Sequence, residues 1–193
     1  VVEQIDGSDA IGMLMCMPRV RCAPGERPVS QTTSDWVNDP PWITVNRSVV
    51  QVAQPGGETV FNRLATANRA RSVDLLRFHG HGLPGHQVLF WGASFDHMTI
   101  STPAMQATLM RLGTIMRPTG SIELHGCNTG MGASGRRLLQ AMANATRVPV
   151  SAGRPTQYGG LQSNGFEGAV VTCCPNGRSL ADWARSAFTG TGG

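Results

Sequence analysis

Residues 72–85 read SVDLLRFHGHGLPG, and this stretch decides the fold that we expect. The apolar run at 72–78 is typical of a buried strand, and the glycines and proline after it indicate a tight loop. A second stretch, SIELHGCNTG at 121–130, repeats the arrangement of a short strand followed by a glycine-rich loop. Both loops carry histidine, and the second also carries Cys127. We therefore expect two strands that each end in reactive side chains.

The segments around these strands alternate between extended and helical patterns. The expected strands lie at 10–17, 87–91, 148–152 and 168–174, and the expected helices at 58–71, 103–116, 135–146 and 179–188. Hydroxyl residues before Pro103 mark the start of the second helix, and Ser134 is the expected cap of the third. This order predicts an α/β domain with a mostly parallel sheet and helices on both faces, a three-layer αβα sandwich.

The 193 residues suit a single domain that spans positions 1–193 and buries a sizeable core. Residues 18–57 contain half of the twelve prolines and predict an irregular excursion with one extended piece near 42–52. The sequence TGTGG at 189–193 predicts a flexible tail. No run of about 18 apolar residues is present, so we expect no membrane span.

Composition argues against nucleic-acid binding and favours a free thiol. The net charge is +4, but the basic residues are scattered and aromatic residues make up only 6%, which disfavours nucleic-acid binding. All sixteen basic residues are arginines, which fits a GC-rich genome or a protein that works where lysines would be ubiquitinated. The five cysteines are an odd number in a chain of this size, so a free or catalytic thiol is expected rather than a disulfide framework.

The two glycine-rich loops carry the chemistry. Ligands of open α/β sheets bind beyond the carboxyl ends of the strands, so neighbouring strands would bring His81 and Cys127 together. A cysteine thiolate is a nucleophile, and a nearby histidine transfers a proton to the leaving amine. The backbone amides of Gly82 and Cys127 follow tight turns and are the candidates for an oxyanion hole.

The order of these motifs resembles the caspase-like fold of clan CD cysteine peptidases. HGLPG at 81–85 and IELHGCN at 122–128 are most similar to bacterial caspase-like domains with HGxxG and GCN motifs, and the helix at 136–146 fits them too. The resemblance covers about residues 72–155. It implies a cysteine endopeptidase that acts on proteins or peptides without a cofactor, with His81 as the catalytic histidine and Cys127 as the nucleophile. Self-processing and a role as a bacterial effector or toxin are both open.

The resemblance also bears on residues around this pair. His79 competes with His81, and we assign His81 because only it is followed by the Gly-x-x-Gly turn. In such enzymes the strand after the nucleophile's helix lines the first specificity pocket, which points to Ser151 and Arg154. Arg154 would favour an acidic substrate side chain, although a solvent-exposed arginine in a loop is the simpler explanation. The site of action stays open between the bacterial cytoplasm and secretion or delivery into a host cell.

Two other interpretations use the same residues. His79, His81, His125 and Cys127 form two His/Cys pairs with one residue between their members, and four such donors suit tetrahedral zinc. A caspase-like module that binds a partner without catalysis is the second alternative. For the peptidase we expect no metal, no nucleic acid and no membrane as partners, and the sequence does not indicate the oligomeric state.

Overall fold

A computed structural model describes residues 2–5, 42–45, 48–52, 57–90, 93–157 and 165–189. Its strands are β1 (Val2–Ile5), β2 (Trp42–Val45), β3 (Ser48–Val52), β4 (Val73–His79), β5 (Gly82–Leu83), β6 (His86–Phe90), β7 (Ala93–Asp96), β8 (Met116–His125), β9 (Val150–Gly153) and β10 (Val170–Cys173). Its α-helices are α2 (Gly57–Ala67), α3 (Pro103–Gly113), α4 (Gly132–Thr146) and α5 (Leu180–Thr189), with short 3₁₀ helices at Thr99–Ser101 and Pro175–Gly177. None of the described helices is long and apolar enough to cross a membrane.

Seven strands form one mixed sheet in the order β1-β3-β2-β4-β8-β9-β10. The pairs β4–β8 and β8–β9 are parallel, whereas β10 joins β9 antiparallel. The four strands from β4 to β10 are therefore mostly parallel, as the sequence predicts. On the other side of β4, the strands β2, β3 and β1 are added in antiparallel pairs, so the sheet as a whole is mixed.

The extended piece predicted near 42–52 is present, but it consists of two strands, β2 and β3, instead of one. β2 and β3 form an antiparallel pair, and β2 also pairs with β4. Their sequences, WITV and SVVQV, are rich in β-branched residues, which favour strands. The strand predicted at 10–17, which includes Cys16, and residues 190–193 of the predicted tail lie outside the described residues. Thr189, the first residue of that tail, belongs to α5.

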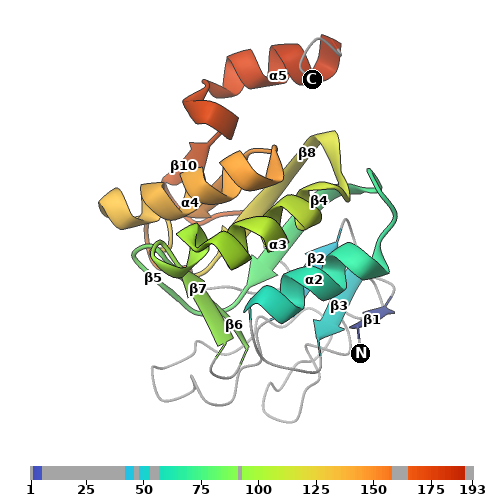
Figure 1. Cartoon of the computed structure of the whole chain (residues 1–193). Coiled ribbons are helices and arrows are strands. Elements are labelled where there is room, and N and C mark those ends of the chain that lie inside the picture. The colour runs from blue at the N-terminus through green and yellow to red at the C-terminus, as the bar shows by residue number, and fades with distance from the viewer. Residues whose placement is uncertain are drawn as a thin grey trace, which may run out of the picture.

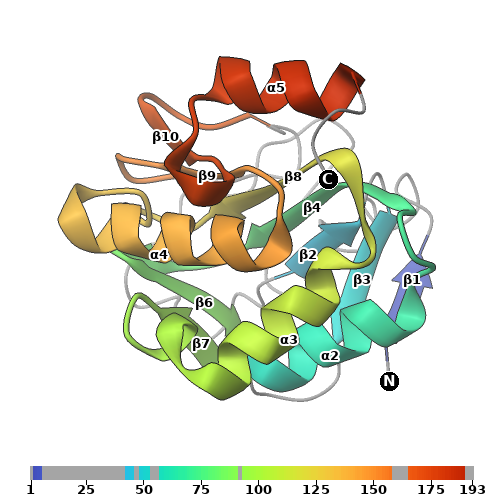
Figure 2. The same ribbon diagram turned by 45° about the horizontal axis from the view of Figure 1, so that its top comes forward.

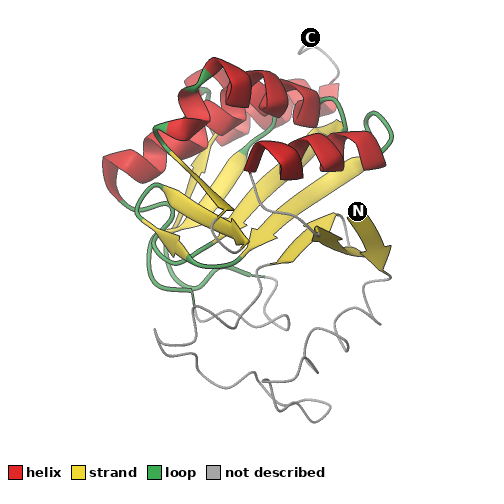
Figure 3. Ribbon diagram, turned by 60° about the horizontal axis from the view of Figure 1, so that its bottom comes forward, coloured by secondary structure: helices red, strands yellow, loops and turns green. Residues whose placement is uncertain are grey.

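Helices α2, α3 and α4 lie side by side and cover one face of the sheet (Figures 1 and 3). Alternate residues of a strand point to opposite faces, so Leu76 and Phe78 of β4 face this helical layer, while Arg77 and His79 face away from it. The rings of Phe61 on α2 and Phe78 lie 5.6 Å apart. The main core therefore lies between the three helices and the sheet.

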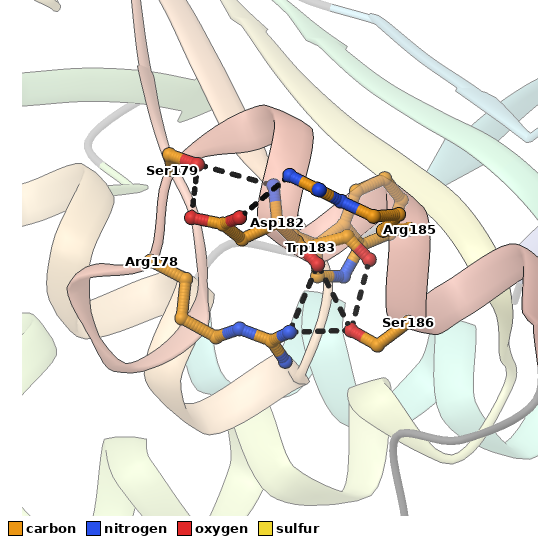
Figure 4. Close-up of polar contacts among 6 residues, drawn as sticks. All are labelled: Arg178, Ser179, Asp182, Trp183, Arg185 and Ser186. Atoms are coloured by element: carbon orange, nitrogen blue, oxygen red, sulfur yellow. Dashed lines mark hydrogen bonds and ion pairs between the residues drawn. The ribbon is translucent and has the colours of Figure 1, made fainter.

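Helix α5 lies apart from this layer, beyond the β8–β10 part of the sheet, and it contacts β8 (Figures 1 and 2). Ser179 caps it, because the Ser179 hydroxyl accepts a hydrogen bond from Asp182 N at 3.1 Å. The same hydroxyl donates to the Asp182 carboxylate, which Arg185 also binds at 2.9 Å (Figure 4). These polar contacts fix the start of the helix, one residue from the position expected from the sequence.

A second, three-stranded sheet, β5-β6-β7, lies within the connection between β4 and α3. The sequence indicates only one strand here, at 87–91. Phe95 of β7 is fully enclosed and lies 5.2 Å from Phe61 and 6.0 Å from Phe78, measured between ring centroids. This aromatic cluster of Phe61, Phe78 and Phe95 fastens the small sheet to α2 and β4.

Several element boundaries differ from the prediction, and the first helix, expected at 58–71, ends at Ala67. The helix expected at 103–116 ends at Gly113, and β8 begins at Met116 rather than at Ser121. β8 includes Pro118 and Gly120, which fall in a bulge where its register against β4 shifts. The cap predicted at Ser134 is also wrong: α4 begins at Gly132, so Ser134 lies inside its first turn.

Candidate active site

Parallel pairing of β4 with β8 brings the two glycine-rich loops to one edge of the sheet. Their last residues, His79 and His125, lie opposite each other in the register. The chain then continues into the 80–85 loop on one side and the 126–131 loop on the other. The sequence therefore located both loops correctly, and the neighbouring strands on which the pairing of His81 and Cys127 depends are present.

The glycines of the HGLPG motif allow the two loops to touch. A Cβ atom on Gly82 would lie 2.3 Å from Thr129 Oγ1 and 2.8 Å from the carbonyl oxygen of Cys127, closer than side-chain carbons approach other atoms. Gly85 has a φ of 72°, which favours glycine, and its Cα hydrogens face the main chain of Ser134. Residue 82, next to His81, thus packs directly on the peptide that carries Cys127.

Thr129 joins the loops by hydrogen bonds as well. Its carbonyl accepts from Gly85 N at 3.1 Å, and its buried hydroxyl donates to the carbonyl of His86 at 3.1 Å. Gln87 is also fully buried, and its amide donates to the carbonyl of Val88 at 3.0 Å and reaches that of His81 at 3.4 Å. These two side chains hold the main chain around His81 in place.

The Cys127 thiol is partly buried against the segment that follows β9. Cys127 Sγ lies 3.3 Å from both the amide nitrogen and the carbonyl oxygen of Gln157, with geometry suited to accepting from the first and donating to the second. The next residue, Asn128, has a φ of 58° and donates its N–H to the carbonyl of Pro155 at 3.1 Å. The 126–131 loop therefore continues the contact between β8 and β9.

The two candidate histidines have different surroundings. His81 is half-buried, at the start of the loop that packs on Cys127. His79 is buried on the sheet, where its ring stacks on His125 with centroids 4.6 Å apart, and His125 stacks in turn on Phe166. Burial lowers the pKa of His79 well below its ordinary value, and the nearby His125 and Arg77 lower this pKa further.

A polar network lies on the face of the sheet opposite the helices α2–α4. Glu123 accepts hydrogen bonds from Arg77 Nε at 2.6 Å and pairs with His125 Nε2 at 2.9 Å. Burial by itself would raise the pKa of Glu123, but the hydrogen bonds from His125 and Arg77 outweigh it and lower the pKa. Glu123 is therefore a carboxylate, and it ties β4 to β8 just before their loops.

The residues expected to line a specificity pocket lie on β9 and just after it. Ser151 is half-buried, opposite Glu123 in the register, and its hydroxyl lies 2.8 Å from that of Thr172 on β10. Arg154 is exposed, and its backbone N–H bonds Ala169 O at 2.8 Å. Ser151 thus belongs to the same sheet face as Glu123, and the side chain of Arg154 is available to solvent.

The four donors of the zinc interpretation do not form a metal site in this structure. Among the described residues, no group of three or more His, Cys, Asp or Glu side chains is arranged to hold a metal ion. His79 and His125 stack face to face, His125 Nε2 is bound to Glu123, and the Cys127 thiol is bound to the main chain of Gln157. These contacts give three of the four donors, His79, His125 and Cys127, partners other than a shared metal centre.

Three residues that sequence analysis did not single out support the site: Gln87, Thr129 and Gln157. Thr129 and Gln87 lie within or beside the glycine-rich loops, and a polar side chain in an apolar strand is a usable signal for Gln87. Gln157 lies 30 positions from Cys127 in the sequence and has no such signal. Its role depends on the pairing of β8 with β9.

Comparison with known proteins gives one match. A sequence model described as "Domain of unknown function (DUF4347)" matches residues 42–165, more than half of the chain. The matched region includes β4, β8, β9 and both glycine-rich loops. No curated protein matches the chain. No solved structure matches it either.

Proposed function

Because the chain belongs to the family described as Domain of unknown function (DUF4347), whose description assigns no activity, we propose its function from the site: a cysteine endopeptidase of caspase-like type. Cys127 is the nucleophile and His81 is the general acid and base. The substrate is a protein or peptide. Self-processing and action as a bacterial effector are both consistent with this chemistry.

One observation carries the proposal. Gly82 packs on the Gly126–Cys127 peptide so closely that a methyl group would not fit, which brings the residue after His81 against the main chain of Cys127. A peptidase needs this kind of contact, since its nucleophile, its histidine and its oxyanion donors must act on a single carbonyl group. The buried position of His79, its stacking and its lowered pKa support the choice of His81.

The proposed reaction follows the chemistry of thiol acyl transfer. Cys127 Sγ, having given its proton to His81, attacks the scissile carbonyl carbon, and the amides of Gly82 and Cys127 donate hydrogen bonds to the oxyanion. His81 gives the proton to the leaving amine as the C–N bond breaks, which leaves a thioester on Cys127. Water then attacks the thioester with His81 as the base, and this step releases the acid product and the free thiol.

The proposal extends to the fold. A three-layer αβα arrangement of caspase-like type is supported by α2–α4 on one face of the sheet and by α5, which lies apart from them and contacts β8. In that arrangement Ser151 and Arg154 contribute to the pocket for the substrate residue before the cleaved bond. The exposed guanidinium of Arg154 would then favour an acidic side chain there.

Labelling with peptidyl acyloxymethyl ketones tests the nucleophile. A panel that differs in the residue next to the reactive group is expected to label Cys127, as shown by peptide mapping, with acidic residues preferred. Cys127→Ala abolishes the label, and Arg154→Ala removes the acidic preference while labelling persists. Labelling that survives in Cys127→Ala would show that another residue is the nucleophile.

The same experiment separates the peptidase from a non-catalytic binding module. If no peptidyl reagent labels the chain although iodoacetamide still alkylates Cys127, the thiol is accessible but not catalytic. N-terminal sequencing of the incubated chain provides a second measurement. An internal cut that requires Cys127 supports self-processing and gives the cleavage preference.

A further inference from the structure

The main chain of Gln157 engages the Cys127 thiol in both directions. The Gln157 N–H donates to Sγ, and the thiol donates to the Gln157 carbonyl, each with a separation of 3.3 Å. A thiol has one hydrogen to donate, whereas the reactive thiolate can only accept. The carbonyl contact therefore favours the unreactive thiol, and it must be lost before the sulfur can act as a nucleophile.

The side chain of Gln157 holds this segment in place. Its amide group donates to the carbonyl of Pro155 at 3.0 Å and to that of Glu167 at 3.1 Å, while its oxygen accepts from Glu167 N at 2.9 Å. All three bonds are to main-chain atoms. They join the segment after β9 to the segment before β10, with the Cys127 thiol beside the joint.

Gly153, the last residue of β9, provides space for this side chain. A Cβ atom on Gly153 would lie 2.3 Å from Gln157 Nε2 and 2.7 Å from its Cδ. Any larger residue at 153 would move the amide group away from its three partners. The glycine and the glutamine thus form one unit, and each can be tested separately.

We infer that Gln157 is a positioning residue that clamps the 155–157 segment onto Cys127 and holds the site in a resting state. The inference rests on the proposed function, because it concerns the residue assigned there as the nucleophile. Substrate binding or movement of the 165–167 segment releases the carbonyl of Gln157 from the sulfur. The clamp thereby couples the reactivity of Cys127 to the connection between β9 and β10.

The rate of alkylation of Cys127 by iodoacetamide tests the clamp without any peptidase assay. Gln157→Ala is expected to raise this rate by about 5–10-fold, the factor that corresponds to loss of about one net hydrogen bond. Gln157→Glu keeps the length of the side chain but places an acceptor against two carbonyls, and it is expected to raise the rate similarly. Gly153→Ala leaves Gln157 in place but pushes its amide group off its partners, so it should also raise the alkylation rate. It tests the clamp if the Gln157 variants do not fold.

Gln140→Ala is the matched control, because Gln140 also binds a distant carbonyl, that of Cys174, at 2.8 Å, away from the site. Its alkylation rate should equal that of the parent. Equal acceleration in Gln140→Ala, or folded Gln157 and Gly153 variants that react at the parental rate, would refute the clamp. A chain without peptidase activity that still shows the acceleration would refute the proposed function and leave the clamp intact.

A spectroscopic measurement distinguishes positioning from general loosening. The S–H stretching band of Cys127, assigned by its loss in Cys127→Ala, should move to higher frequency in Gln157→Ala as the bond to the carbonyl is lost. Gln140→Ala should leave the band where it is. A band that does not move in folded Gln157→Ala would overturn the inference.

Discussion

At the scale of single residues, the contact between Gly82 and the Gly126–Cys127 peptide leaves no room for a methyl group. Gly82→Ala would place a carbon 2.3 Å from Thr129 Oγ1, so the two loops must separate. We expect a loss of about 1–3 kcal/mol in the free energy of unfolding. We also expect a loss of about 100-fold in kcat/KM, because catalytic groups displaced by about 1 Å lose this much.

Met98→Ala is the control for this substitution. Met98 is 72% exposed, so urea unfolding and peptide cleavage should both match the parent. Parental activity in Gly82→Ala would show that the close approach of the loops does not matter for function. It would remove the main support for a joint site.

The two histidines give a second prediction at this scale. His81→Ala is expected to lower kcat by about 10²–10⁴-fold, the usual loss for a general acid and base. His79→Phe keeps an aromatic ring in the stack with His125 and should retain most of the activity. The reverse result in a peptide cleavage assay, with His79→Phe inactive and His81→Ala active, would assign catalysis to His79.

The places of the candidate site residues in the fold could be predicted where a motif puts them beside a strand end. His81, Gly82 and Cys127 follow from the Gly-rich loops and from the rule that ligands bind at the carboxyl ends of parallel strands. Gln157 could not be predicted, because its contact with the thiol arises only when β9 lies beside β8. Local sequence patterns do not contain such a pairing.

At the scale of secondary-structure elements, the small sheet β5-β6-β7 carries the loop residues Gly82 and Gly85 and depends on one aromatic side chain. Phe95 of β7 lies against Phe61 and Phe78 and is 1% exposed. Phe95→Ala is expected to cost about 3–5 kcal/mol of stability, the range for removing a buried aromatic ring. Thermal unfolding followed by circular dichroism would measure it.

Phe188→Ala on α5 provides the matched comparison, since Phe188 is 74% exposed. It should change the stability by about 0.5 kcal/mol or less. If Phe95→Ala is as mild as Phe188→Ala, the small sheet is not held by the aromatic cluster. Loss of activity at a temperature where Phe95→Ala is still folded would link the small sheet to the site.

Helices and strands could be predicted where the periodicity of hydrophobic residues and the capping residues indicate the same boundaries. Helix α3 is an example, since Thr102 caps it and Pro103 is its first residue. They were not predictable where distant pairing decides the conformation. Pro118 and Gly120 end a helix by local rules, yet they lie in β8 because the bulge against β4 accommodates them. Likewise, α4 starts at Gly132, after the turn that packs on the 80–85 loop, and the hydroxyl residue two positions later, Ser134, does not set this start.

At the scale of the whole molecule, the sheet has one apolar face under the helices and one face with buried titratable groups, which makes stability depend on pH. The pKa of His79 is lowered below its ordinary value of 6.5, so the unfolded chain binds more protons than the folded chain just below that pH. This part of the stability is therefore present above pH 6.5. It is lost as the pH falls through the lower pKa of the folded state.

The pKa of Glu123 is also lowered, from an ordinary value of 4.5. Its contribution to the free energy of unfolding is therefore present above pH 4.5 and is lost at lower pH, outside the range in which His79 acts. Urea unfolding of the parent is expected to show a falling free energy from about pH 6.5 toward about pH 5, where histidines titrate. His79→Phe should flatten this range, and Glu123→Gln should flatten only the range below 4.5. An unchanged slope between pH 6.5 and pH 5 in His79→Phe would show that His79 has the same pKa in the folded and the unfolded chain, so that its ring, although stacked on His125, takes up a proton as readily as an exposed histidine.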